Sequence, residues 1–210
     1  MLPGPIYVYG CPQCGHYFAR GSIASGNTFG SRLYSDGKRI SPMLPDFSEL
    51  TRCESCHKIF KIRDARKIGS YDFWKQPEER FANVNSAEEL EIADYFEAIR
   101  QGIPENKDEE HKLRREIWWA YNDRMRNDGQ IFSDDQDEIL WKENLEILLD
   151  LLDQNKPAEH LMMAEIQRNL GDFEACMNLL KTFDHPDLSW VKDIMTGECR
   201  RGNRWVVEVR

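Results

Sequence analysis

The residues of this chain whose type and spacing indicate a specific chemistry, metal binding, are four cysteines in two pairs. They are Cys11 and Cys14, separated by Pro-Gln, and Cys53 and Cys56, separated by Glu-Ser. Each Cys-x-x-Cys pair forms a tight turn in which two thiolates converge, and two such turns supply the four sulfurs that structural zinc prefers, at Zn–S distances of about 2.3 Å. The sequence therefore predicts one structural Zn²⁺ ion bound by these four cysteines.

Three other chemistries use related patterns. Cys53 to His57 fits the C-x-x-C-H haem-attachment pattern, but that chemistry occurs in exported proteins and the first residues do not resemble an export signal. A redox dithiol needs one Cys-x-x-Cys beside a βαβ pattern, whereas two pairs in Gly-rich, strand-like surroundings favour a shared ion. Iron in a rubredoxin-like site suits the same four sulfurs, so the choice between zinc and iron stays open. We expect His16 and His57 to lie outside the ligand set.

Composition excludes a membrane span, since 31% of the 210 residues are charged, mean hydropathy is -0.67 and no apolar run approaches the length of a spanning helix. Cys176 and Cys199 lie in helix-like segments and do not complete a disulfide framework, so we expect a cytoplasmic protein. The net charge of -9 is unevenly divided. Residues 1–70 hold 10 Lys and Arg against 5 Asp and Glu, and residues 71–210 hold 18 against 32.

Short β-rich runs surround the cysteine pairs. Arg32–Tyr34 and Arg39–Ile40 flank Asp36-Gly37, which indicates a hairpin turn, and Gly-rich residues 21–31 indicate a loop. The other runs predicted as strands are 6–9, 17–20, 50–52 and 59–62.

Residues 6–63 resemble a zinc ribbon. The resemblance rests on Cys11-Pro-x-Cys14-Gly15 with Phe18 after it, and on the second pair with Phe60 after it. A ribbon of this size buries too little apolar area to fold without its metal. Thirty-eight residues separate Cys14 from Cys53, more than in a compact ribbon, so we expect the insert to be an elaboration.

Helical periodicity dominates after an irregular connector over residues 64–84, which we expect to be packed by its aromatic side chains. Ser86 and Glu89 form a capping-box pattern, which predicts a helix beginning there and ending before Gly102 and Pro104. Further helices are predicted over residues 108–127, 137–153, 157–170, 172–183 and 189–200, and residues 205–209 are interpreted as a short strand or a capping segment.

The pair of helices joined at Gly171 resembles a tetratricopeptide repeat. Ala164, Gly171-Asp172-Phe173 and Cys176 occupy that family's small-residue and turn positions. The whole chain resembles bacterial proteins in which a zinc ribbon precedes a helical-repeat body, a resemblance that implies no particular activity. The predicted class is α+β: a zinc ribbon (1–68), an aromatic connector with a capping helix (69–107) and an all-α, tetratricopeptide-like domain (108–210).

No nucleophile arrangement, phosphate loop or H-E-x-x-H motif is recognisable. We expect His111, Glu159 and His160 to be solvated or packing residues, at least one of Trp118 and Trp119 to be core, and the acids of residues 134–138 to lie at a helix N-terminus. The predicted function is a non-enzymatic zinc-binding adaptor in which the helical body, together with the ribbon, docks a protein partner. We expect no attachment to a membrane. The alternative is a nucleic-acid-binding ribbon that uses Arg20, Arg32, Lys38, Arg39, Lys58, Lys61 and Arg63.

Overall fold

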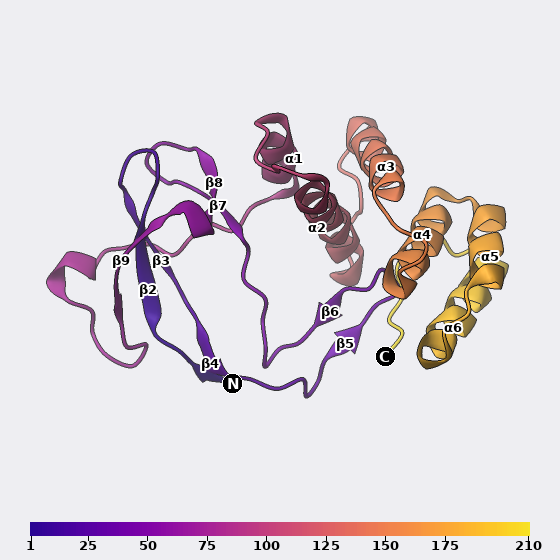
Figure 1. Cartoon of the computed structure of the whole chain (residues 1–210), viewed down its shortest axis with the longest axis horizontal. Coiled ribbons are helices and arrows are strands. Elements are labelled where there is room, and N and C mark those ends of the chain that lie inside the picture. The colour runs from indigo at the N-terminus through magenta and orange to yellow at the C-terminus, as the bar shows by residue number, and fades with distance from the viewer. The chain divides into compact units, whose positions relative to one another are not determined.

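A computed structural model describes all 210 residues and has small antiparallel sheets in the N-terminal part and six helices in the C-terminal part (Figure 1). The predicted α+β class is therefore confirmed. None of the six helices combines the length and the apolar character that crossing a bilayer requires.

The chain forms two compact units. The ribbon unit consists of Met1–Ser31 and Ser41–Ile103, and the helical unit consists of Arg32–Ile40 and Pro104–Arg210. The predicted division had placed residues 32–40 in the ribbon and residues 104–107 in the connector. The chain thus passes from one unit to the other three times, after residues 31, 40 and 103.

The ribbon unit is built on a three-stranded antiparallel sheet in the order β3-β2-β9. The strands are β2 (Ile6–Gly10), β3 (Tyr17–Arg20) and β9 (Arg66–Tyr71). Two smaller antiparallel pairs are β1 (Leu2–Pro3) with β4 (Ile23–Ser25), and β7 (Leu50–Arg52) with β8 (Ile59–Lys61). The strands predicted on either side of both cysteine pairs are confirmed.

Strand β9 corrects the prediction of an irregular connector. It pairs with the first β-run of the chain, with Tyr7 opposite Ser70 and Val8 opposite Gly69. A Cβ atom at Gly69 would lie 2.9 Å from the ring of Phe81, so only glycine lets that buried ring close over the strand. Packing by aromatics therefore holds for Phe81 but not for Trp74, whose side chain is 71% exposed.

The predicted capping box at Ser86 is wrong. Ser86 instead forms a parallel bridge with Ala19 of β3, and α1 (Ile92–Arg100) begins later. The carboxylate of Asp94 accepts a hydrogen bond from the Glu91 amide at 2.9 Å. Glu91 and Asp94 therefore form the capping box of α1, in place of Ser86 and Glu89. Asp94 also forms an ion pair with Arg52, which ties α1 to β7.

The helical unit contains α2 (Lys107–Arg126), α3 (Asp135–Asp150), α4 (Pro157–Leu170), α5 (Phe173–Thr182) and α6 (Ser189–Arg200). Caps set several of their ends: Asn106, Asp134 and Asp172 each accept from an amide three residues on, and Gly171 ends α4 with φ at +88°. The acids of residues 134–138 thus lie at a helix N-terminus, as predicted.

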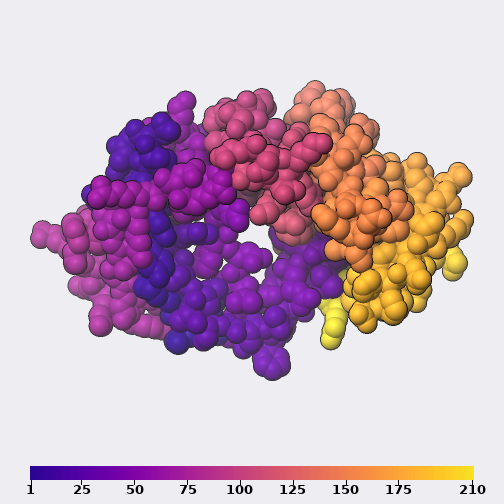
Figure 2. Space-filling view, viewed as in Figure 1, coloured from indigo at the N-terminus to yellow at the C-terminus, as the bar shows by residue number.

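Buried apolar side chains hold these helices together. Trp118, Tyr121, Trp141 and Leu145 are fully buried on α2 and α3. Leu161, Ala164, Leu180 and Met195 belong to one apolar cluster on α4, α5 and α6. These three helices form one continuous surface from orange to yellow (Figure 2).

The inserted hairpin belongs to the helical unit. Its strands are β5 (Arg32–Leu33) and β6 (Arg39–Ile40), around the predicted Asp36-Gly37 turn. Residues 207–210 lie beside β5: the Leu33 amide donates to the Arg210 carbonyl at 2.7 Å, and the Val209 amide donates to the Leu33 carbonyl at 2.8 Å. Glu208 also pairs with Tyr34 in an antiparallel bridge. The C-terminal residues therefore cap the hairpin through strand-like pairing, which combines the two roles predicted for them.

Candidate metal centre

The four predicted cysteines come together in the ribbon unit, positioned to bind a metal ion. Their sulfur atoms all lie within 4.8 Å of one another. The Sγ atoms of Cys11 and Cys56 are 3.8 Å apart, and those of Cys14 and Cys53 are 3.6 Å apart. A tetrahedral ion with metal–sulfur distances of about 2.3 Å separates its sulfurs by about 3.8 Å. The spacing therefore fits a four-coordinate ion.

The first cysteine turn follows strand β2 directly. The Gly15 amide donates to the Cys11 carbonyl at 2.9 Å, and the Cys11 amide donates to the His16 carbonyl at 2.8 Å. The Gln13 amide lies 3.4 Å from the Cys11 sulfur. Backbone amides directed at a sulfur favour the thiolate over the thiol, which is the form that binds metal.

The second turn repeats these backbone contacts between β7 and β8. The His57 amide donates to the Cys53 carbonyl at 2.8 Å, and the Cys53 amide donates to the Lys58 carbonyl at 2.9 Å. The residue after each pair adopts a left-handed backbone, with φ of +76° at Gly15 and +57° at His57. The Cys-x-x-Cys turn therefore requires a left-handed backbone at the residue after its second cysteine, whether that residue is glycine or histidine.

Replacing His57 with glycine is expected to stabilise the metal-loaded ribbon by about 1 kcal/mol, because a side chain disfavours the left-handed backbone. Gly15→Ala is the matched opposite change, since nothing lies within 4 Å of a Cβ there and only the φ of +76° opposes it. We expect it to weaken the fold by a similar amount. Chelator competition measures both, as about a fivefold rise and a fivefold fall in metal affinity. Equal affinities for both variants would contradict the strain argument.

Burial differs within each pair. Cys11 and Cys53 are buried, Cys56 is half-buried and Cys14 is exposed. Burial raises the pKa of Cys53 to about 12, whereas the backbone hydrogen bond from His16 lowers the pKa of Cys14 to about 7. A bound dication deprotonates coordinating thiols outright, so metal binding would stabilise the charge that burial opposes.

Aromatic rings support the buried side of the centre. Cys11 and Cys53 share an apolar cluster with Phe18 and Phe60, whose ring centroids are 5.5 Å apart. Tyr9 stacks on Phe18 at 5.6 Å. The aromatics that follow each cysteine pair in the sequence therefore form a common support for both turns.

The geometry separates the alternative cysteine chemistries. The group of potential ligands contains neither histidine, and the His16 ring lies 3.7 Å from the Glu54 carboxylate instead. Cys53 and Cys56 share their cluster with the first pair, which is the arrangement expected of one four-sulfur site rather than of a haem attachment or a separate dithiol. Zinc and iron both accept four sulfurs, so the arrangement leaves the metal's identity open.

A cleft of about 400 Å³ lies beside the second cysteine turn. Residues that line it include His16, Tyr17, Glu54, His57, Asn85 and Glu88. The Asn85 amide donates to both Glu54 oxygens, at 3.1 and 2.8 Å. Sequence reasoning missed this cleft because its walls come from three separate segments, and only the bridge between Ala19 and Ser86 brings the third segment beside the others.

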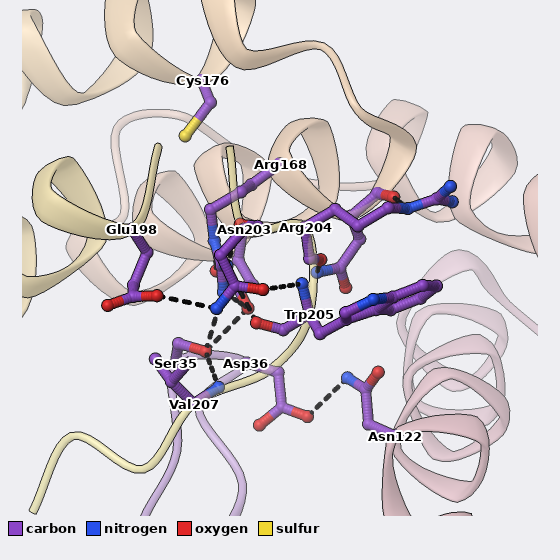
Figure 3. A network of polar contacts seen from close by, with 12 residues as sticks. Ser35, Asp36, Asn122, Arg168, Cys176, Glu198, Asn203, Arg204, Trp205 and Val207 are labelled. Carbon is purple, nitrogen blue, oxygen red and sulfur yellow. Dashed lines mark hydrogen bonds and ion pairs between the residues drawn. The ribbon is translucent and has the colours of Figure 1, made fainter. Parts of the chain in front are cut away.

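A second group of polar side chains was also missed, in the helical unit (Figure 3). Ser35 donates to the buried carboxylate of Glu165 at 2.7 Å, and Arg168 is paired with the same carboxylate at 2.6 Å. Asp36 forms an ion pair with Arg126 and accepts from Asn122 at 2.8 Å. We call these residues of hairpin and helices the hairpin network.

The hairpin network also holds the C-terminal segment. The Arg168 guanidinium donates to the carbonyls of Asn203 and Trp205, at 2.5 and 2.8 Å, and the Val207 amide donates to the Ser35 hydroxyl at 3.0 Å. The side chains of Glu165 and Arg168 are fully buried. Because the buried polar atoms of Ser35, Glu165 and Arg168 satisfy one another, the arrangement stabilises the helical unit.

The histidines and tryptophans of α2 and α4 that we expected to be solvated or packing residues are buried or half-buried. His160 is buried and its Nε2 lies 3.0 Å from the Leu179 carbonyl. Burial lowers the pKa of His111. Trp118 is fully buried, and the half-buried Trp119 donates its indole hydrogen to the Asp36 carbonyl at 3.1 Å.

Comparison of the chain with protein-family models, curated proteins and solved structures finds no match. The resemblance to zinc-ribbon proteins therefore rests on the four clustered cysteines and the helices that follow them. The resemblance to a tetratricopeptide repeat stays a prediction.

Proposed function

We propose that this is a non-enzymatic zinc-binding protein that acts by binding another protein. The observation that carries the zinc assignment is the spacing of the four sulfurs, at 3.6 and 3.8 Å in the two cross-turn pairs. Four thiolates fill the coordination sphere of zinc, whereas catalytic zinc keeps a position for water or substrate. The role of Cys11, Cys14, Cys53 and Cys56 is therefore structural.

Elemental analysis of the purified protein tests this assignment. We expect one zinc ion per chain, retained through gel filtration and lost after Cys11→Ser. Strong visible absorption would identify ferric iron in the same four sulfurs. A metal content near zero in freshly prepared, reduced protein would contradict any structural metal.

The partner site is proposed to be the cleft beside the second cysteine turn rather than a groove of the helical unit. In the helical unit, the hairpin already occupies part of α2 through Asp36 and part of α4 through Ser35. The C-terminal segment packs on the hairpin through the bond from Val207 to Ser35. The cleft combines the aromatic Tyr17, which is 41% exposed, with the polar groups of Glu54 and Asn85. Exposed tyrosine beside polar groups is a common composition of protein interfaces.

Charge reversal tests this location. Glu54→Arg is expected to abolish capture of specific partners from native lysate, whereas Glu79→Arg, another exposed acid of the ribbon unit outside the cleft, should leave capture unchanged. Both variants should retain one zinc ion, so a loss of capture cannot be assigned to loss of the fold. Identical capture by wild type and both variants would remove the cleft from the proposal.

The nucleic-acid alternative is weakened by the division of the chain. Of its seven proposed basic residues, Arg32, Lys38 and Arg39 belong to the helical unit, and Lys38 is paired with Asp123. Lys61 is buried. The ribbon unit itself contains ten Lys and Arg against twelve Asp and Glu. Micromolar binding to RNA or DNA that falls steeply as salt rises would restore this alternative, because phosphate neutralisation releases counterions.

A further inference from the structure

The two cysteines outside the metal centre lie together in the helical unit. Cys176 is on α5 and Cys199 is the last residue but one of α6, and their sulfur atoms are 2.8 Å apart. That distance is shorter than the 3.6 and 3.8 Å between sulfurs across the metal centre. Sulfurs in a disulfide are about 2.05 Å apart. The two sulfurs therefore need only a small movement of their side chains to come within the length of a disulfide bond.

The surroundings of this pair do not suit a metal ion. Leu161, Ala164, Leu180 and Met195 belong to the same buried cluster. The nearby carboxylate of Glu165 is already held by Ser35 and Arg168. Zinc takes three or four protein ligands, so two sulfurs among aliphatic side chains are an incomplete set.

We propose that Cys176 and Cys199 are a two-electron redox couple, which a peroxide oxidises to a disulfide that joins α5 to α6. In the first step the Cys199 thiol reacts with hydrogen peroxide to give a sulfenic acid and one water molecule. In the second step the Cys176 sulfur attacks the Cys199 sulfur, the S–S bond forms and the sulfenic hydroxyl leaves as a second water molecule. The peroxide gains the two electrons that the two thiols lose.

The positions of the two cysteines indicate that Cys199 is oxidised first and that Cys176 then attacks it. Cys199 lies in the last turn of α6 and is 6% exposed, whereas Cys176 lies inside α5 and is fully buried. The ends of helices fray, so the Cys199 thiol is the one that reaches the oxidant. Burial raises the pKa of both thiols, which makes oxidation slow because the thiolate is the reactive form.

The disulfide would act on the C-terminal segment as well as on the two helices. Helix α6 ends at Arg200, and the segment that follows it supplies Asn203 and Trp205 to the Arg168 guanidinium. A bond between residues 176 and 199 closes a loop of the unfolded chain and fixes the end of α6. The oxidised form should therefore open less often at the C-terminal segment than the reduced form.

The full-length, zinc-loaded protein tests the proposal directly. It is incubated with hydrogen peroxide, quenched, alkylated under denaturing conditions, digested and analysed by mass spectrometry. We expect a peptide pair linked through Cys176 and Cys199 to accumulate over hours, and to disappear after dithiothreitol. The midpoint of thermal unfolding of the helical unit should rise by about 10 °C on oxidation.

The variants Cys199→Ala and Cys176→Ser serve as controls, each compared with its own untreated sample. Neither should form the linked peptide or gain thermal stability with peroxide, even if the substitution lowers the starting stability. Oxidation of Cys199 to a sulfinic acid without a linked peptide would overturn the proposal. So would a linked peptide that forms only after the helical unit has been unfolded in urea.

Discussion

Cys53→Ser is expected to abolish tight metal binding and to unfold the ribbon unit while most of the helical signal remains. Structural zinc contributes on the order of 10–16 kcal/mol at neutral pH, which exceeds the whole stability of most domains. Cys53 is a buried ligand of the proposed ion, and its turn joins β7 to β8. The ribbon unit contains a single α-helix of nine residues, so far-UV circular dichroism should retain most of its helical intensity.

Ser55→Ala is the control for this change, because Ser55 is exposed within the same cysteine turn. It should bind one metal ion and keep the dispersed amide NMR signals of the ribbon. Loss of the helical signal together with the metal in Cys53→Ser would show that the two units fold as one cooperative block.

Asp36→Asn is expected to destabilise the helical unit by about 3 kcal/mol, although residue 36 lies in the insert between the two cysteine pairs. The ion pair between Asp36 and Arg126 is almost completely buried, with exposures of 0% and 3% for the two side chains. Without the Asp36 charge, the buried Arg126 guanidinium keeps only its ion pair with Asp123, at 2.7 Å. Breaking part of a buried ion-pair network is far more costly than removing an exposed pair. Urea unfolding followed by helical circular dichroism measures the change.

Asp46→Asn provides the matched control, since Asp46 belongs to the same insert but is exposed. It should shift the free energy of unfolding by less than about 0.5 kcal/mol. A double-mutant cycle with Arg126→Gln should give a coupling of at least about 1 kcal/mol between residues 36 and 126. Equal unfolding curves for wild type and Asp36→Asn would place the hairpin outside the cooperative helical unit.

Local signals account for what the sequence could predict. Both cysteine turns, the Asp36-Gly37 turn and the five later helices depend on residues within a few positions of each other. The prediction of a capping box at Ser86 was wrong although Glu89 stands three positions later, as the motif requires. Ser86 is instead held beside Ala19 of a distant strand. A local motif cannot reveal a competing partner elsewhere in the chain.

Long-range contacts account for what was missed. Strand β9 carries polar residues such as Lys67 and Ser70, and its partner β2 lies about sixty residues earlier in the chain. Likewise, nothing near Asp36 in the sequence indicates Arg126, and nothing near Cys176 indicates Cys199. Hydrophobic periodicity identifies helices and strands. The packing of the hairpin on the helices depends instead on buried polar pairs between residues that are distant in the sequence.

The position of the hairpin has a consequence for the order in which the protein can be completed during synthesis. The hairpin leaves the ribosome long before α4 and the C-terminal segment, which supply Glu165 and Val207 to Ser35. The ribbon unit needs nothing beyond residue 103, so it can bind its metal while the helices are still being translated. Asp36 can meet its partners Asn122 and Arg126 as soon as α2 emerges, whereas Ser35 must wait for α4 and the C-terminal segment.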